Sequence, residues 1–203
     1  MAGADIALDL GTSYVKIYLD GKGIILNEPA VVSINLETDE ALAVGKKAYA
    51  MIGRTSDKIQ VCHPLSGGVI SQFDLAKYLI ETYLKKINVS RLIMPRVVVS
   101  VPCGITEVEE RAVVDSVSST GVRKVCLIDE PVAAALGAGL DISKPHGSLV
   151  VDLGGGTTDM AVISLYGIAI SRSVRIAGDA FDDAVTKYIR RKYNLLIGPD
   201  RKS

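Results

Sequence analysis

Two segments of this 203-residue chain repeat one pattern, and this repeat limits the possible folds more than any other feature. They are IALDLGTSYVKIYLDG, which begins at Ile6, and LVVDLGGGTTDMAVISLYG, which begins at Leu149. Each contains an apolar strand that ends in Asp-Leu-Gly, then a short polar turn, then a second apolar strand. Two copies of one hairpin in one chain predict two similar half-folds that face each other across a cleft.

The remaining pattern alternates strands with helices. Runs rich in β-branched residues predict strands at Ile6–Leu10, Tyr14–Leu19, Ala30–Ile34, Val97–Val101, Val125–Asp129, Ser148–Leu153 and Met160–Leu165. Apolar spacing and helix-start signals predict helices at 73–87, 106–119, from Pro131 through Leu136, and at 179–193. Several strands are apolar on both faces, which favours an α/β fold with a mixed sheet flanked by helices.

The segment from 35 to 65 differs from its surroundings because it is polar and punctuated by glycine. We expect it to form a small inserted subdomain. Residues 1–34 and 66–144 would then form a first large subdomain that carries one phosphate hairpin. Residues 145–203 would belong to a second large subdomain.

Composition excludes several classes of protein. The chain has 23 Lys and Arg against 23 Asp and Glu, with 5% aromatic residues and no Trp, so we expect no nucleic acid partner. Three cysteines without CxxC spacing predict neither a disulfide framework nor a zinc site, and they indicate a reducing cytoplasm. No apolar run reaches the roughly 18 to 20 residues that cross a bilayer, and the first ten residues do not resemble a signal peptide.

The turns of the two hairpins are rich in glycine and hydroxyl groups. They contain Gly11, Thr12 and Ser13 in the first copy and Gly154, Gly155, Gly156, Thr157 and Thr158 in the second. Glycine permits close backbone approach and unusual φ, so that successive N–H groups point at anionic oxygens while the hydroxyls add donors. We therefore expect phosphate-binding turns, with ordinary tight hairpin turns as the alternative.

Charged residues stand beside these turns. Asp9 and Asp152, if brought together, would hold a hydrated Mg²⁺, because magnesium accepts a few carboxylates and keeps several waters. Lys16, in an otherwise apolar strand, is either a solvated residue or a point charge aimed at a phosphate.

Two helix starts add further candidates. Glu130 follows a strand and precedes Pro131, where a carboxylate either orients a water for attack on a γ-phosphate or, with Asp129, simply favours the helix N-terminus. Gly178 and Asp179 open the last helix, where the backbone could meet a nucleotide sugar or phosphate.

A longer set of motifs resembles a known family. The segments DLGTSYVK, LNEPAVVSI, PRVVVSVP, DEPVAAALGAGL, VVDLGGGTTDMAVISL and IAGDAFDDAV are similar, in order and almost without gaps, to MreB-type rod-shape-determining proteins, the bacterial actins. The resemblance covers essentially the whole chain. It implies an actin-like ATPase (ribonuclease H-like) fold whose first half is complete and whose second half is partial, as in a truncated product or a fragment.

The resemblance also implies roles for the site residues. Glu130 and Thr157 resemble the pair that positions the attacking water, and Asp9 and Asp152 resemble the aspartates linked to Mg²⁺ through water. The nucleotide would be held by Asp9, Gly11, Thr12, Ser13, Tyr14, Lys16, Asp152, Gly154, Gly155, Gly156, Thr157, Gly178 and Asp179. Tyr14 departs from the Asn that most MreB-type sequences carry, and Lys16 is more like eukaryotic actin.

The implied function is an ATP-binding, slowly hydrolysing filament protein that organises cell-wall growth at the inner face of the cell membrane. Its partners would be further copies of itself, the membrane and the wall-elongation machinery. Leu92, Ile93 and Met94 resemble a membrane-inserting loop, with packing on the core as the alternative. The other functions considered are a non-polymerising chaperone-type or sugar-kinase-type ATPase, and an inactive half-protein.

Overall fold

The computed structural model describes residues 5–87 and 94–198. Its first layer is a five-stranded sheet in the order β10-β9-β1-β2-β3. The bounds are β1 Asp5–Leu10, β2 Tyr14–Leu19, β3 Gly23–Pro29, β9 Arg96–Val101 and β10 Lys124–Asp129. β1, β9 and β10 run parallel, whereas β1, β2 and β3 pair antiparallel, so the sheet is mixed as the sequence predicts.

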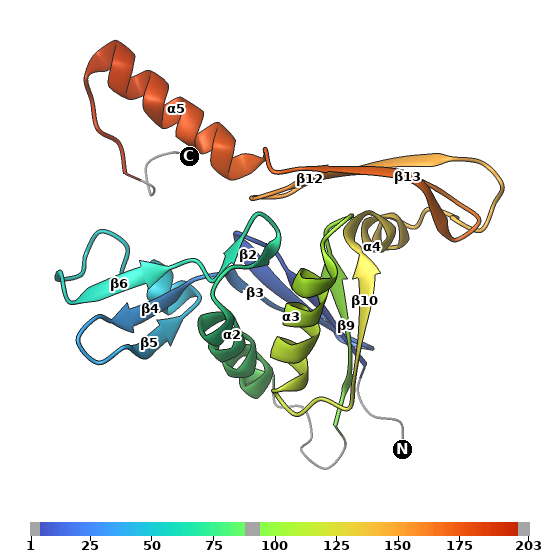
Figure 1. The fold of residues 1–203 in the computed structure, drawn as a ribbon, viewed down its shortest axis with the longest axis horizontal. Helices are drawn as coiled ribbons and strands as arrows, with labels where there is room; N and C mark the ends of the chain where they lie inside the picture. Colours follow the sequence, from blue (N-terminus) through green and yellow to red (C-terminus); the bar gives the residue numbers. More distant parts are fainter. Residues whose placement is uncertain (1–4, 88–93, 199–203) are drawn as a thin grey trace.

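Two helices, α2 (Phe73–Lys86) and α3 (Glu107–Ser118), cover one face of this sheet (Figure 1). Alternate residues of β1 and β2 point into the resulting core, and Val15 and Ile17 are fully buried there. From α2, Leu79 and Tyr83 reach the same core. These apolar positions fix which face of each strand points inward and therefore the register of the first glycine-containing hairpin.

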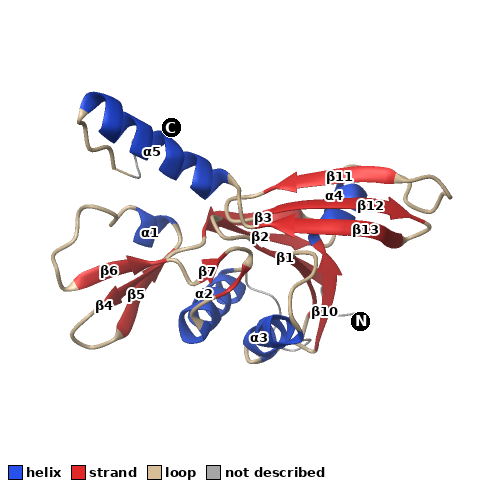
Figure 2. Cartoon of the chain, turned by 45° about the horizontal axis from the view of Figure 1, so that its top comes forward, coloured by secondary structure: helices blue, strands red, loops and turns tan. Residues whose placement is uncertain are grey.

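Beyond β3 the chain builds a separate small sheet in the order β5-β4-β6, beside the short helix α1 (Figure 2). The bounds are β4 Val32–Asn35, β5 Glu40–Val44, α1 Lys46–Tyr49 and β6 Ile59–Cys62. A two-stranded ribbon, β7 (Leu65–Ser66) with β8 (Val69–Ile70), then returns the chain to the large sheet.

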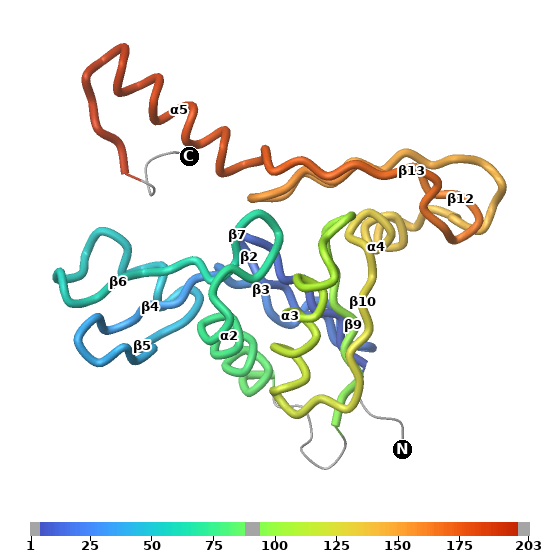
Figure 3. Tube along the Cα trace, viewed as in Figure 1, coloured from blue at the N-terminus to red at the C-terminus, as the bar shows by residue number. Residues whose placement is uncertain are grey.

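The second layer begins with α4 (Glu130–Gly137), which leads to a three-stranded antiparallel sheet in the order β11-β12-β13. The strands are β11 Ser148–Leu153, β12 Thr158–Ser164 and β13 Gly167–Val174, and α5 (Gly178–Tyr193) follows them. Ala135 of α4 packs against Ala161 and Ile163 of β12. As the trace in Figure 3 shows, α5 extends away from the body of the molecule, and none of its residues is buried.

The predicted elements are largely present, but the strand predictions miss six strands. β3, β5, β6, β7, β8 and β13 were not expected, because β3 ends in Asn-Glu-Pro, β5 and β6 are only five and four residues long, β7 and β8 have two residues each, and β13 is mostly exposed. The strand expected from Ala30 begins at Val32. Ala30 and Val31 are buried without belonging to a strand, so burial and not extended pairing explains their apolar character.

Candidate functional site

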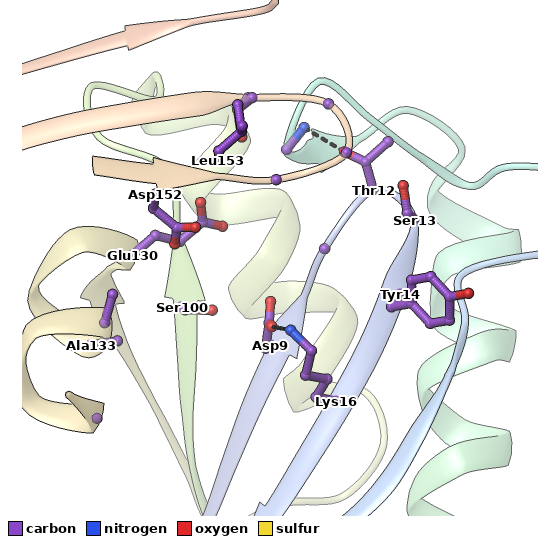
Figure 4. Close-up of a pocket in the computed structure, with 18 of the residues that line it drawn as sticks. Asp9, Thr12, Ser13, Tyr14, Lys16, Ser100, Glu130, Ala133, Asp152 and Leu153 are labelled. Atoms are coloured by element: carbon purple, nitrogen blue, oxygen red, sulfur yellow. Dashed lines mark hydrogen bonds and ion pairs between the residues drawn. The ribbon is translucent and has the colours of Figure 1, made fainter. Parts of the chain in front are cut away.

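A cavity of about 650 Å³ lies between the two layers, where both hairpin turns meet the start of α4 (Figure 4). The predicted residues that line it are Asp9, Gly11, Thr12, Ser13, Tyr14, Lys16, Glu130, Asp152, Gly154, Gly155, Gly156 and Thr157. Ile24, Gly68, Ser100, Ala133, Ala134, Gly137 and Leu153 complete the lining. This volume falls within the range of about 300 to 1,000 Å³ that is usual for small-molecule and cofactor sites.

The two turns contact each other directly. A Cβ atom added to Gly155 would overlap Ser13 Oγ, and one added to Gly156 would overlap Thr12 Oγ1. None of the turn glycines has a positive φ, so they are required for close approach and not for the unusual φ that the sequence analysis expected. The Gly68 N–H also donates a hydrogen bond of 3.0 Å to Thr12 Oγ1, which ties the β7–β8 ribbon to the first turn.

Acidic side chains outnumber basic ones in the cavity lining. Lys16 Nζ lies 3.0 Å from Asp9 Oδ2, because β1 and β2 place these two residues opposite each other. Burial raises the pKa of Asp152, and the negative charge of Asp9 adds to this effect. Burial likewise raises the pKa of Glu130 to about 8, with smaller contributions from nearby carboxylates.

This electrostatic arrangement fits a bound divalent cation. Asp9, Asp152 and Glu130 line one cavity with Lys16 as the cation beside them, so an added positive charge would relieve their repulsion. The described residues contain no group of three or more His, Cys, Asp or Glu that could hold a metal ion by itself. Two carboxylates with several waters are the ligand set that suits Mg²⁺, so Asp9 and Asp152 are the candidates.

The position of Glu130 is compatible with both interpretations that the sequence analysis left open. It is the first residue of α4, with Asp129 at the N-cap position and Pro131 in the first turn. Asp129 makes no side-chain capping hydrogen bond. Glu130 therefore occupies a helix start and also lines the cavity, where its carboxyl group points toward Asp152 (Figure 4).

Sequence reasoning missed one acidic residue, Asp159. This residue is fully buried on β12, opposite Asp152 of β11, and its Oδ1 accepts a hydrogen bond of 2.9 Å from the Cys103 N–H at the end of the first layer. Its Oδ2 has no hydrogen-bond partner among the described residues. The signal was available in the two-residue alternation of the strand, because Asp159, Ala161 and Ile163 share one buried face.

Gly178 and Asp179 lie outside the cavity lining. The Gly178 N–H donates to the Gly154 carbonyl oxygen at 3.1 Å, and the Asp179 N–H donates to that of Gly155 at 2.9 Å. The first turn of α5 is therefore hydrogen-bonded to the second glycine-rich turn. Direct contact of these two residues with a nucleotide stays a prediction.

The expected membrane loop is only partly described. Leu92 and Ile93 lie outside the described residues, and Met94 is 54% exposed. Within residues 5–87 and 94–198, no helix combines the length and apolar character that a membrane crossing needs.

Comparison with protein families and curated proteins gives consistent matches. The family model described as MreB/Mbl protein matches residues 3–203. The cell shape-determining protein Mbl of Bacillus subtilis (strain 168) is 45% identical over 199 residues, which are 98% of this chain and 60% of that relative. The cell shape-determining protein MreB of Escherichia coli (strain K12) is 46% identical over 204 residues, or 98% of this chain and 59% of that protein. The chain thus spans about 60% of the length of these relatives.

Solved structures give the same match. The crystal structure of MreB5 of Spiroplasma citri bound to ADP has a TM-score of 0.92 and 39% identity, and it covers 98% of this chain and 60% of that one. The AMPPNP-bound structure of the same protein has a TM-score of 0.92 and 38% identity, with 100% and 61% covered. The MamK double helical filament shares the fold with a TM-score of 0.82 at 19% identity, over 98% of this chain and 62% of that one.

Proposed function

The chain belongs to the MreB/Mbl protein family, and from this membership we propose that it binds ATP with Mg²⁺ between its two glycine-rich turns and hydrolyses it slowly. The observation that carries the proposal is the single cavity that gathers both turns, Lys16 and three carboxyl groups. One relative, MreB5 of Spiroplasma citri, whose crystal structures contain ADP and AMPPNP, supports it.

Different residues of the site would bind the phosphates, orient the attacking water and hold Mg²⁺. Backbone N–H groups of the two turns, with the hydroxyls of Thr12 and Thr157, would donate hydrogen bonds to phosphate oxygens. Lys16 would add a positive charge on the same side. Glu130 and Thr157 would orient a water for in-line attack on the γ-phosphate. When bound, Mg²⁺ would neutralise phosphate charge, with Asp9 and Asp152 holding it through water.

Binding is tested by calorimetry with the 203-residue chain, titrated with ATP and Mg²⁺ and, for comparison, with ADP. A dissociation constant in the micromolar range is expected because both phosphate turns are already in contact. Absence of binding in a sample that circular dichroism shows to be folded would contradict the proposal for this chain.

Hydrolysis is tested with Glu130→Ala. Removing a group that orients the attacking water is expected to lower the rate of phosphate release by about 100-fold or more, because such groups contribute roughly 10² to 10⁴ in rate. The ATP dissociation constant should change by only a few-fold. An unchanged turnover would remove Glu130 from the mechanism.

We propose that the protein acts as a cytoplasmic, filament-forming protein in cell-shape determination, together with the membrane and the wall-elongation machinery. The names of its curated relatives and the shared fold of a filament-forming protein support this role. ATP-dependent sedimentation is the test, because a non-polymerising ATPase would stay in the supernatant with and without nucleotide. The division into residues 1–34 with 66–144, 35–65 and 145–203 belongs to the same proposal.

Membrane association is proposed for the loop that contains Leu92, Ile93 and Met94. Replacing Leu92 and Ile93 by serine is expected to abolish co-flotation with liposomes. The variant loses the free energy of burying these two side chains in the membrane, which is at most roughly 5 kcal/mol per subunit. Nucleotide affinity should be unchanged. Persistent flotation of the variant would place the membrane contact elsewhere.

A further inference from the structure

A second cavity, of about 360 Å³, lies along the outer edge of the large sheet, and it shares no lining residue with the cavity between the two turns. Four consecutive residues of β3, from Ile25 to Glu28, line it. Side chains of consecutive strand residues point to opposite faces, so a cavity that all four line follows the edge of the strand and not one face of the sheet. The opposite wall is the C-terminal end of α2, with Lys86 and Ile87.

Part of the edge of β3, at Asn27, is open to hydrogen bonding. Among the described strands, β3 pairs only with β2 and ends the sheet. Tyr83 donates a hydrogen bond of 2.9 Å to the carbonyl oxygen of Pro29, which therefore points away from β2. Backbone groups of an antiparallel strand alternate in direction, so those of Asn27, two residues earlier, also point outward. Within the part of the chain that the structure describes, the Asn27 N–H and C=O have no hydrogen-bond partner.

This groove is mainly polar and basic. Lys22, Lys46 and Lys86 surround it, Ile87 supplies apolar surface, and Leu19 and Leu26 are buried in the core. Glu28 is already engaged, since Lys86 Nζ lies 3.1 Å from its Oε1 and the Lys46 backbone N–H donates to its Oε2 at 3.2 Å. The ammonium groups of Lys22 and Lys46 have no ion-pair partner among residues 5–87 and 94–198, so the rim keeps excess positive charge.

We propose that this groove, between the edge of β3 and the end of α2, binds an extended acidic segment of a partner protein that adds to β3 as a further strand. Strand addition between an edge strand and a helix is a general mode of peptide recognition, in which backbone hydrogen bonds give affinity and flanking side chains give specificity. The inference goes beyond the proposed function, because none of these residues takes part in nucleotide binding.

The lysines set the choice of partner. Lys22, Lys46 and Lys86 come from the turn before β3, from α1 and from α2, and positive charge beside a sheet edge discourages pairing with basic strands. An acidic strand is attracted by the same lysines. The three ammonium groups therefore favour acidic segments and disfavour basic ones. Apolar residues at alternate positions of the ligand would contact Ile87 and the half-buried Ile25, while acidic residues at the other positions would meet Lys22 and Lys46.

The test uses the full 203-residue chain and a capped, fluorescein-labelled peptide of alternating Val and Glu, eight residues long, measured by fluorescence anisotropy. Saturable binding is expected, and the combined Lys22→Glu and Lys46→Glu substitutions should weaken it by about tenfold or more, because attraction becomes repulsion. A matched charge control is Lys124→Glu with Lys187→Glu, which should leave binding unchanged. A Val-Lys peptide of equal length should not bind.

Backbone pairing is tested separately, with two changes that leave the charges intact. A peptide N-methylated at alternate residues cannot donate to the edge and should lose binding to the unmodified protein. Asn27→Pro removes the outward N–H, which edge strands tolerate, and should weaken binding by about tenfold, whereas Asn27→Thr should not. Circular dichroism would establish that both variants fold.

Three outcomes would overturn the proposal. Equal binding of the methylated and unmodified peptides would mean charge attraction without strand addition. Displacement of the peptide by millimolar inorganic phosphate would mean a simple anion site. Binding of phosphatidylglycerol vesicles that depends on Lys22 and Lys46 but not on Asn27 would mean a lipid surface in place of a protein partner.

Discussion

Glu130→Gln is expected to abolish most of the loss of stability that the ligand-free protein shows between pH 6 and pH 8. Burial raises the pKa of Glu130 from its usual 4.5 to about 8, so in this interval the folded state holds a proton that the unfolded state has lost. Stability then falls as pH rises, by about 1.4 kcal/mol per pH unit, or about 2 kcal/mol over the interval. Glutamine mimics the protonated carboxyl at every pH, so its profile should be nearly flat.

The measurement is urea unfolding at pH 6, 7 and 8, without nucleotide or divalent cations. Glu110→Gln is a matched control, because Glu110 is an exposed residue on α3 and should leave the slope unchanged. The same slope in Glu130→Gln and the unmodified protein would mean that Glu130 does not bind the extra proton. In the folded protein the thiol of Cys103 stays protonated between pH 6 and pH 8, because burial raises its pKa to about 11.

Gly155→Val is expected to weaken ATP binding by at least about 100-fold. Even the first carbon of the new side chain would overlap Ser13 Oγ, so the two turns must separate and can no longer surround the same phosphates. The loss corresponds to about 2.7 kcal/mol of binding free energy. Calorimetric titration with ATP and Mg²⁺ measures it directly.

The control for this substitution is Gly167→Ala, at the start of β13. A Cβ there would lie 3.7 Å from the nearest atom, the Ser164 carbonyl oxygen, which is an ordinary contact. It should bind ATP like the unmodified protein. Undiminished affinity in Gly155→Val would show that the turns need not touch for nucleotide to bind.

The repeated hairpin made most of the site predictable from the sequence. Both copies pair as expected, and the start of α4 brings Glu130 to the same cavity. The family and the actin-like fold were also identified correctly from the motifs. Local signals sufficed here because a glycine-rich turn between two apolar strands determines its own geometry, and the parallel strands β1, β9 and β10 then align their ends.

The parts that could not be predicted depend on contacts between distant segments. The partner of Asp159 is the backbone of Cys103, 56 residues away, and no pattern near either residue indicates it. Gly178 and Asp179 start a helix as expected, but only the packed structure directs their N–H groups to the second turn. β3 was missed because an edge strand does not need the apolar alternation of an inner one.

The attachment of α5 has a mechanical consequence. Its first N–H groups are hydrogen-bonded to the carbonyl oxygens of Gly154 and Gly155, and the helix then continues for 16 residues, or about 24 Å. Rotation of the helix by about 5° about that anchor displaces its far end by about 2 Å. A small rotation at the second turn therefore becomes a larger displacement at the end of α5. A small adjustment of the backbone around a phosphate would be magnified at the distal end, where Arg190, Arg191 and Lys192 lie.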